Sequence, residues 1–222
     1  MSSSSFLPNR RGAVRLKSAR KHSPSSQRWL ERQLNDPYVQ AAKTQGYRSR
    51  AAFKLIELDE RYKLIRPGGR VVDLGVAPGG WTQVALKRGA GRVVGIDLLP
   101  IEPIPAATFL TGDFQDAASE RELLAVLGGT ADLVLSDMAP NTTGHVATDH
   151  LRILALAELA LDFGERVLRP GGAFVTKLFQ GGAQAPMLAT LKRRFSVVRH
   201  AKPAASRKES RELYLIALGF RE

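Results

Sequence analysis

Short apolar runs alternate with amphipathic stretches along most of the chain, and this pattern predicts a layered α/β domain. Each apolar run is rich in β-branched and aliphatic residues and has the length of a single strand. The seven runs are RVVDL (70–74), RVVGID (92–97), ATFLTGD (107–113), DLVLSD (132–137), AFVTK (173–177), FSVVRH (195–200) and ELYLIAL (212–218). Strands that alternate with helices are typical of a mostly parallel sheet covered by helices on both faces.

Apolar residues at steps of three and four positions predict the helices. The helices expected after the first run cover residues 79–89, 116–127, 148–168 and 184–194. Upstream, the sequence AAFKLIELDERYKL predicts a helix that has Ser49 as its N-cap and ends before Arg66. Residues 26–42 predict a short helix that Pro37 interrupts, because proline has no backbone N–H to donate inside a helix.

The last two runs are joined by residues 201–211, which show no helical pattern. Parallel neighbours need a longer crossover, usually a helix, so these two runs are expected to pair antiparallel. The pattern therefore predicts a seven-stranded, mostly parallel sheet with one antiparallel strand, in a single domain over residues 26–222.

Basic residues are concentrated at the N-terminal end of the chain, whose formal net charge is +12. Residues 1–50 hold 11 Lys or Arg against Glu31 and Asp36, whereas residues 51–222 hold 22 against 19 acids. Residues 1–25 are also rich in serine and poor in apolar residues, which predicts a disordered basic tail. Such an arm indicates a polyanionic partner. We favour nucleic acid over an anionic membrane, because the arm lacks a sustained apolar face.

The composition excludes several kinds of chemistry. The chain has no cysteine, so it forms neither a disulfide framework nor a thiolate metal site, and it has no cysteine nucleophile. No apolar run reaches the roughly 18 residues of a membrane span, and the polar start lacks the apolar core of a signal peptide. We therefore expect a soluble, cytoplasmic protein with no membrane partner.

The sequence VVDLGVAPGGW, residues 71–81, predicts a strand, a tight turn and the start of a helix. Glycine lets the backbone approach a ligand closely, and the free N–H groups of such a turn suit a nucleotide-like group. Ala77 stands where a G-x-G-x-x-G pattern has its middle glycine, and no GK[ST] follows, so a P-loop is excluded. A turn made for packing alone, a dinucleotide site and an S-adenosylmethionine site remain as alternatives.

Ionisable residues stand at or just after the ends of the predicted strands, where an open α/β sheet binds its ligands. They are Asp73, Asp97, Asp113, Asp137 and Lys177, together with Glu212 at the start of the antiparallel strand. Singly, each could be a helix cap or a surface charge, and Glu212 could pair with Arg207 or Arg211. Together, like charges along one edge indicate a ligand. Asp97, about 20 residues beyond the turn, suits hydrogen bonds to ribose hydroxyls.

Lys177 follows the apolar run AFVT, so its stem is expected to be partly buried. Burial lowers the pKa of a lysine and a nearby carboxylate raises it. A neutral lysine amine can take a proton from an alcohol, and Asp137 and Glu212 could orient it. The edge of the sheet could therefore carry a proton acceptor.

His145 and His150 flank Asp149 in the segment GHVATDH. Two imidazoles and one carboxylate without fixed geometry are weak evidence for a metal ion, so no metal site is predicted. Asp149 is better explained as an acid in the first turn of a helix, where the helix dipole favours negative charge.

The motifs VVDLGVAPGGW, GIDLLP, GDF, SDMAPN, FVTKLFQG and SRKESRELY occur in this order, with YRSRAAFKL upstream. Over residues 28–221 they closely resemble the RrmJ/FtsJ family of S-adenosylmethionine-dependent ribose 2′-O-methyltransferases. The resemblance implies a Rossmann-like class I methyltransferase fold with S-adenosyl-L-methionine as the cofactor. It also implies a monomer that methylates a uridine ribose of 23S-type large-subunit rRNA, either free or in the assembling large ribosomal subunit.

Members of that family carry a Lys-Asp-Lys-Glu tetrad with a lysine as the proton acceptor. The resemblance assigns its four positions to Lys54, Asp137, Lys177 and Glu212, with Lys177 as the acceptor. Lys54 depends on the resemblance alone, because beside Glu57 at i+3 it looks like an ordinary helix ion pair. Val76 inside the glycine turn departs from the family pattern.

The resemblance also implies a set of cofactor-binding residues. Gly79 and Trp81 would contact the cofactor. Asp97 would bind its ribose, Asp113 its adenine edge and Asp137 its methionine end.

Two other functions stay open at this point. A base-methylating RNA methyltransferase commonly carries an Asn/Asp-Pro-Pro-aromatic loop, whereas residues 137–140 read DMAP and contain no aromatic ring. An RNA-binding ribosome-assembly factor would use the basic arm without turnover, which the intact tetrad disfavours.

Overall fold

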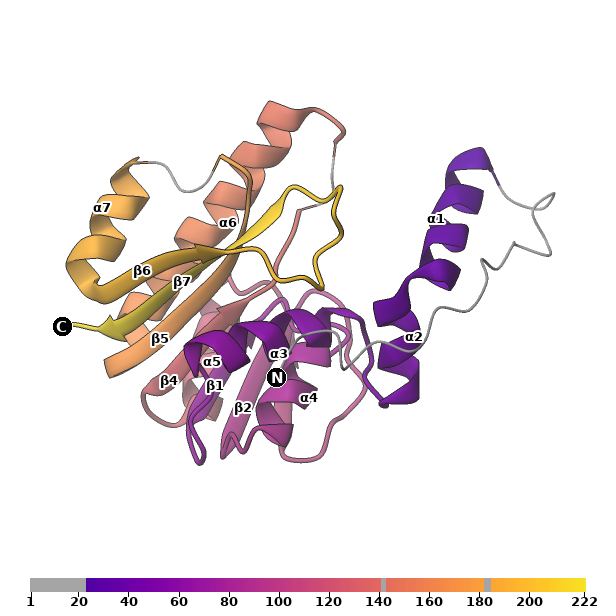
Figure 1. The fold of residues 1–222 in the computed structure, drawn as a ribbon. Coiled ribbons are helices and arrows are strands. Elements are labelled where there is room, and N and C mark those ends of the chain that lie inside the picture. Colours follow the sequence, from indigo (N-terminus) through magenta and orange to yellow (C-terminus); the bar gives the residue numbers. More distant parts are fainter. Residues whose placement is uncertain (1–22, 141–142, 182–184) are drawn as a thin grey trace.

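The computed structural model describes residues 23–140, 143–181 and 185–222 (Figure 1). The helices in these ranges are α1 (Pro24–Asn35), α2 (Pro37–Thr44), α3 (Ala51–Tyr62), α4 (Gly80–Lys87), α5 (Ala117–Leu127), α6 (Val146–Val167) and α7 (Ala185–Arg194). The strands are β1 (Arg70–Leu74), β2 (Arg92–Asp97), β3 (Ala107–Thr111), β4 (Ala131–Ser136), β5 (Leu168–Phe179), β6 (Phe195–Ala201) and β7 (Glu212–Phe220). All the predicted strands are confirmed. Residues 1–22 of the predicted tail lie outside the described residues.

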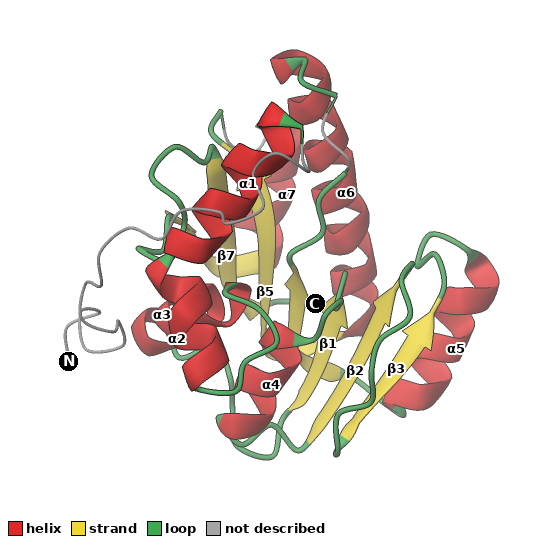
Figure 2. Cartoon of the chain, turned by 90° about the vertical axis from the view of Figure 1, so that its right-hand side faces the viewer, coloured by secondary structure: helices red, strands yellow, loops and turns green. Residues whose placement is uncertain are grey.

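One sheet of seven strands, in the order β3-β2-β1-β4-β5-β7-β6, forms the centre of the molecule (Figure 2). β7 runs antiparallel to both of its neighbours, and β1 to β5 pair in parallel. This confirms the antiparallel strand predicted from the short final connection. The strand order reverses between β1 and β4, and sheets of this kind bind their ligands at that point, beyond the carboxyl ends of the strands.

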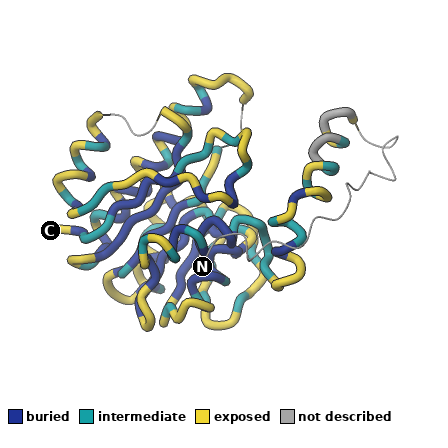
Figure 3. Tube along the Cα trace, viewed as in Figure 1, coloured by how far each residue is buried: buried dark blue, intermediate teal, exposed yellow. Residues whose placement is uncertain are grey.

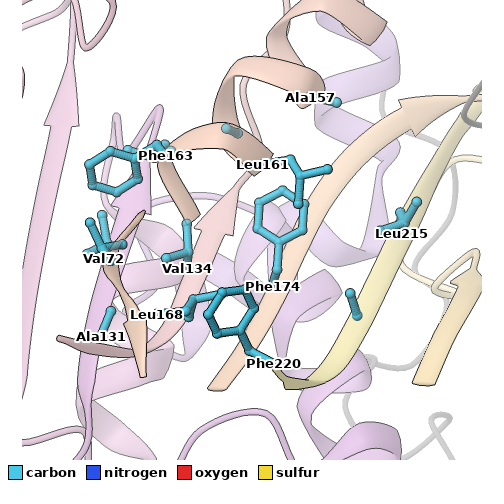
Figure 4. Packing of buried hydrophobic residues seen from close by; sticks show 14 of the residues in the cluster. Val72, Ala131, Val134, Ala157, Leu161, Phe163, Leu168, Phe174, Leu215 and Phe220 are labelled. Carbon is cyan, nitrogen blue, oxygen red and sulfur yellow. The ribbon is translucent and has the colours of Figure 1, made fainter. Parts of the chain in front are cut away.

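The side chains of each strand alternate between two apolar cores, one on each face of the sheet. Figure 2 shows α3 and α4 on one face and α5, α6 and α7 on the other. In β1, Val71 packs in the α3–α4 core, whereas Val72 packs in the α5–α7 core. Figure 4 shows Val72, Val134 and Phe174 in this second core, and Figure 3 shows that the strands between the helices are the most buried part of the chain. A residue's position along its strand therefore decides which helices it faces.

The region before α3 folds as two helices, and the predicted interruption at Pro37 is confirmed. The prediction missed that Pro37 starts a second helix, α2. Proline suits this position, because its φ is already helical and its missing N–H would have no partner within the helix. Asp36 caps α2, since its Oδ1 accepts the backbone N–H of Tyr38 at 3.0 Å.

The N-cap predicted for α3 is also wrong. Arg50 occupies the cap position with helical angles, φ −62° and ψ −20°, and no side chain caps the helix. The hydroxyl of Ser49 is instead buried without a hydrogen-bond partner, and it lies so close to Gly80 that any side chain there would collide with it. Close packing between Ser49 and the start of α4 therefore requires glycine at residue 80.

Among the described residues, no helix combines the length and the apolar character that a bilayer crossing requires.

The glycine-rich turn lies directly over β2. The backbone N–H groups of Gly75 and Val76 both donate to the carbonyl of Ile96, at 2.9 and 3.3 Å. A Cβ at Gly95 would lie 2.9 Å from three side-chain carbons of Val76. The turn can therefore approach the strand this closely only because residue 95 has no side chain.

We expect Gly95→Ala to lower the free energy of unfolding by about 1–3 kcal/mol, because the added methyl group overpacks the site against Val76. Val76→Ala removes two of the three colliding carbons, so the double variant should be more stable than the sum of the two single effects predicts. Urea denaturation of the wild type, both single variants and the double variant measures this. Strictly additive effects would contradict the contact.

Candidate active site

Strand alternation brings polar side chains to the face of the sheet on which α3 packs. Lys177 of β5 and Tyr214 of β7 are direct partners in the antiparallel register, so their side chains project from the same face. Tyr214 belongs to the α3–α4 core, and Glu212 lies two residues earlier on the same strand and therefore on the same side. Asp137 immediately follows β4. From above, α3 supplies Lys54, which is buried.

Lys54 connects the acidic groups of two strands. Its Nζ lies 2.7 Å from Glu212 Oε2 and 3.1 Å from the hydroxyl oxygen of Tyr214. The same nitrogen is 4.0 Å from Asp137 Oδ2 and 5.6 Å from the centre of the Tyr214 ring. One ammonium group therefore holds β7, α3 and the end of β4 together.

Asp137 is the acceptor that the other groups share. Its Oδ1 accepts the hydroxyl of Tyr214 at 2.7 Å and lies 3.0 Å from Lys177 Nζ, which also donates to the backbone carbonyl of Asp137 at 2.5 Å. Burial by itself raises the pKa of Asp137, but Lys177, Lys54 and the Tyr214 hydroxyl outweigh burial and hold that pKa below its usual range. Asp137 is therefore ionised at neutral pH.

Tyr214 is the member of this cluster that the sequence reasoning missed. Burial, followed by the charges of Asp137 and Glu212, raises the pKa of Tyr214 well above its usual value, so its hydroxyl keeps its proton and donates it to Asp137. A signal was present, because Tyr214 stands two residues after Glu212 on a predicted strand and must share its face.

These contacts exclude the surface ion pairs of Lys54 with Glu57 and of Glu212 with Arg207. Lys54 does not pair with Glu57, whose carboxylate accepts the backbone N–H of Ala205 at 3.1 Å. Glu212 pairs with Lys54, whereas Arg207 contacts Asp36 at 3.3 Å. The structure thus brings the four residues of the predicted tetrad into one connected cluster.

A cavity of about 640 Å³ lies beyond the carboxyl ends of the parallel strands. Its lining combines the glycine turn, three acids and an apolar side chain, contributed by Gly75, Ala77, Asp97, Asp113, Asp137 and Met138. Three of the predicted cofactor-binding residues are therefore at this cavity, and Asp137 belongs both to it and to the tetrad.

The acids of the cavity are fixed by backbone groups. Asp97 Oδ2 accepts the N–H of Ala77 at 2.9 Å, and its Oδ1 accepts the N–H of Leu99 at 3.0 Å. Asp113 Oδ1 accepts the N–H of Gln115 at 3.0 Å. A carboxylate has about four lone-pair sites, so both acids keep acceptor capacity for the hydroxyl or amine groups of a ligand.

Gly79 and Trp81, the other two predicted cofactor-binding residues, are not among the residues that line the cavity. Gly79 is the N-cap of α4, with a φ of 104°. The Trp81 side chain is buried, its Nε1 donates to the carbonyl of Ala51 at 2.8 Å, and its ring lies 5.7 Å from that of Tyr214. The indole therefore joins α3, α4 and β7 beneath the tetrad, and a cofactor contact by these two residues stays a prediction.

Arg48 is a second residue that the sequence reasoning missed. Its guanidinium donates to the backbone carbonyls of Pro78, Glu102 and Pro103, at 3.1, 2.6 and 2.8 Å. Its own backbone N–H donates to the side chain of Gln83 at 2.8 Å. Arg48 therefore ties the glycine turn to the loop that follows β2, a contact between segments that no local pattern in the sequence connects.

The predicted first-turn position of Asp149 in α6 is confirmed. Its carboxylate accepts the backbone N–H of Thr143 at 2.7 Å and that of Gly144 at 3.2 Å, and the hydrogen bonds from Thr143 lower its pKa. Within the described ranges, no three His, Asp or Glu side chains are grouped so that they could hold a metal ion.

The donors and acceptors of the cavity fit S-adenosylmethionine. Asp97 and Asp113 offer acceptors for ribose hydroxyls and an adenine amine, while Leu98 and Met138 offer apolar surface. The ionised Asp137 favours a cation nearby. A Cβ at Gly75 would collide with Met138, so the turn and the loop after β4 pack tightly where they border the cavity. The volume is also typical of a small-molecule cofactor site.

Comparison with known proteins gives close matches. The family model described as FtsJ-like methyltransferase matches residues 47–220. Ribosomal RNA large subunit methyltransferase E of Acidiphilium cryptum is 74% identical over 212 residues, which cover 96% of this chain and 94% of that protein. The protein of the same name from Granulibacter bethesdensis is 66% identical over 208 residues, with 94% and 90% covered.

A solved structure supports the same comparison. The crystal structure of a ribosomal RNA methyltransferase from Plasmodium falciparum superposes with a TM-score of 0.69 at 33% identity. The match covers 78% of this chain and 98% of that chain.

Asp73 lies beneath the rim of the sheet, so the expectation that it joins the ligand edge is wrong. It is 1% exposed, and its Oδ2 accepts the hydroxyl of Thr82 on α4 at 2.8 Å. Burial, aided by the charges of Asp137 and Asp97 and opposed by the Thr82 hydrogen bond, raises the pKa of Asp73 to about 7. Between its usual pKa of 3.8 and about 7, the folded chain therefore keeps a proton on Asp73 that the unfolded chain has released.

The free energy of unfolding should therefore contain a contribution from Asp73 that falls as the pH rises through about 7. Asp73→Asn removes this contribution and keeps an acceptor for Thr82. We expect the stability of the variant relative to the wild type to increase between about pH 5 and about pH 8, as measured by urea denaturation. A difference that stays constant over this range would show that Asp73 does not titrate there.

Proposed function

The chain belongs to the FtsJ-like methyltransferase family, and on this premise we propose that it methylates the 2′-oxygen of a uridine ribose in large-subunit rRNA, with S-adenosyl-L-methionine as the methyl donor. The observation that carries this proposal is the position of Asp137. This residue lines the large cavity and also contacts Lys177 at 3.0 Å and Lys54 at 4.0 Å. A donor in the cavity would thus lie next to the lysines that handle the acceptor hydroxyl.

The cofactor, when bound, supplies a methyl group on a positively charged sulfur. Asp97 would accept hydrogen bonds from its ribose hydroxyls, and Asp113 would accept one at its adenine edge. The ionised Asp137 would orient its methionine end. Gly79 and Trp81, at the start of α4, would contact the cofactor.

Lys177 is the proton acceptor in this proposal. Its Nζ, in the neutral form, would take the proton of the 2′-hydroxyl while that oxygen accepts the methyl group that the bound cofactor would supply. The two hydrogen bonds to Asp137 direct the nitrogen, and Lys54 and Glu212 balance the charge of the cluster. Most of the rate enhancement would come from orientation, because two reactants held in line need no further positioning.

Two features favour ribose over base methylation. The loop after β4 reads Asp137-Met138-Ala139-Pro140 and offers no aromatic ring on which a planar base could stack. Lys177 and Lys54 converge on one carboxylate, and this arrangement suits removal of a hydroxyl proton. Alkaline hydrolysis of the product separates the two reactions, because a 2′-O-methyl group blocks cleavage at the adjacent phosphodiester and a base methyl group does not.

The relatives' names support large-subunit rRNA as the substrate. We further propose that the chain works as a monomer in the cytoplasm, with residues 1–25 as a basic tail ahead of one domain. A ribosome-assembly factor without turnover is the rival proposal.

Lys177→Met should reduce methyl transfer to large-subunit rRNA by at least about a hundredfold, because the variant keeps the length of the buried stem and loses only the amine. Binding of S-adenosylmethionine should persist, since Lys177 does not line the cavity. Incorporation of labelled methyl groups measures the first effect, and titration calorimetry measures the second.

Lys63→Met is the matched control, because it makes the same change at an exposed lysine at the C-cap of α3. It should methylate at the wild-type rate. Near-normal turnover in Lys177→Met would remove Lys177 from the chemistry, and absence of transfer in the wild type would favour the assembly factor.

A further inference from the structure

A second cavity, of about 450 Å³, borders the tetrad. Lys54 and Glu212 line it, although neither lines the larger cavity. Its remaining walls come from α1, from the start of α3 and from the connection between β6 and β7. Figure 1 shows this connection passing over α3. The two cavities therefore border different members of the same cluster of catalytic side chains.

The walls of this second cavity carry excess positive charge. Three arginines line it, one from each wall: Arg32 of α1, Arg50 at the start of α3 and Arg207 of the β6–β7 connection. Two acids also line it, but Glu212 is engaged by Lys54 at 2.7 Å. A cavity with this balance of charge attracts an anion.

Asp36 holds two of these arginines together. A single oxygen, Oδ2, lies 3.0 Å from Nη1 of Arg50 and 3.3 Å from Nε of Arg207, while the other oxygen caps α2. Asp36 is 8% exposed, so it lies behind the arginines and away from the solvent. Both guanidinium groups are therefore fixed next to each other before any ligand binds.

The backbone of the β6–β7 connection is fixed as well. The N–H of Ala205 donates to the carboxylate of Glu57, and its carbonyl accepts a hydrogen bond from Nη2 of Arg50. Both contacts come from α3 or its N-cap, so the arginine wall is anchored to the helix that carries Lys54. The distance between this wall and the tetrad is thereby set.

The arginine pair has more donors than the chain uses. Nε of Arg50 is buried without a hydrogen-bond partner. Among the described residues, the terminal nitrogens of Arg207 contact no acceptor. Burial lowers the pKa of Arg50, and the charge of Arg207 adds to this although Asp36 opposes it. The single negative charge of Asp36 therefore does not balance the positive charges of both guanidinium groups. The planar guanidinium group of arginine matches the oxygens of a phosphate.

We propose that this second cavity binds a phosphodiester of the acceptor RNA strand, within about one nucleotide of the ribose that is methylated. The proposal rests on the function proposed above and names a subsite for its substrate. Phosphate contacts position a strand without reading its sequence, so the subsite would set the register of the ribose at Lys177.

The N-terminal helices are part of this subsite. The family match begins at residue 47, whereas α1 supplies Arg32 and Asp36 caps α2. These two helices therefore complete an RNA site whose catalytic half lies inside the matched domain. Their function is to hold Asp36 and Arg32 at the edge of the cavity.

We test the subsite with Arg207→Gln and Arg32→Gln, using methyl transfer to large-subunit rRNA at several salt concentrations. Each variant should raise KM for the RNA by about tenfold, as expected for the loss of one charge-assisted hydrogen bond. The slope of log KM against log salt should fall by about one for each arginine. kcat and the affinity for S-adenosylmethionine should change little.

Arg207→Lys keeps the charge without the fork and should retain the salt slope while recovering only part of the affinity. Arg121→Gln is the matched control, because Arg121 is an exposed arginine of α5 on the opposite face of the sheet. It should leave KM and the salt slope unchanged.

Wild-type values of KM and salt slope in both Arg207→Gln and Arg32→Gln would overturn the subsite. A wild type that transfers no methyl group would instead overturn the proposed function, and filter binding of the same rRNA by the same variants would then judge the subsite alone. Equal filter binding by the wild type and both variants would overturn it, whereas weaker binding with a smaller salt slope would support it.

Discussion

The ion pair between Asp137 and Lys177 is the interaction on which the rest of the site depends. A buried carboxylate is costly unless charges and hydrogen bonds compensate it, and here two lysines and a tyrosine hydroxyl converge on it. These groups come from β4, β5, β7 and α3. They meet only because strand alternation directs three of them to the face on which α3 packs. The site is thus a consequence of the sheet's register and cannot form in a single segment.

Each of the two cavities borders different members of this cluster. At the first cavity, the glycine turn, Asp97 and Asp113 border a volume suited to a cofactor. At the second cavity, arginines fixed by Asp36 border a volume suited to a phosphodiester. Asp137 lines only the first cavity, and Lys54 lines only the second.

The sequence predicted best the features that depend on residues close together in the chain. Alternation of apolar runs predicted every strand, and the short final connection predicted the antiparallel one. The sequence was least informative where packing between distant segments decides. Ser49 looked like a helix cap, but its neighbour in space is Gly80. Lys54 looked like a partner for Glu57, but the fold places it on Glu212.

A map of 2′-O-methyl groups tests ribose methylation of large-subunit rRNA most directly. Resistance to alkaline hydrolysis would be recorded along the large-subunit rRNA of cells with and without the gene for this chain. We predict that resistance disappears at one uridine in its absence and returns when the wild-type protein is supplied. An unchanged map, or the loss of a methyl group from a base instead, would contradict ribose methylation by this chain.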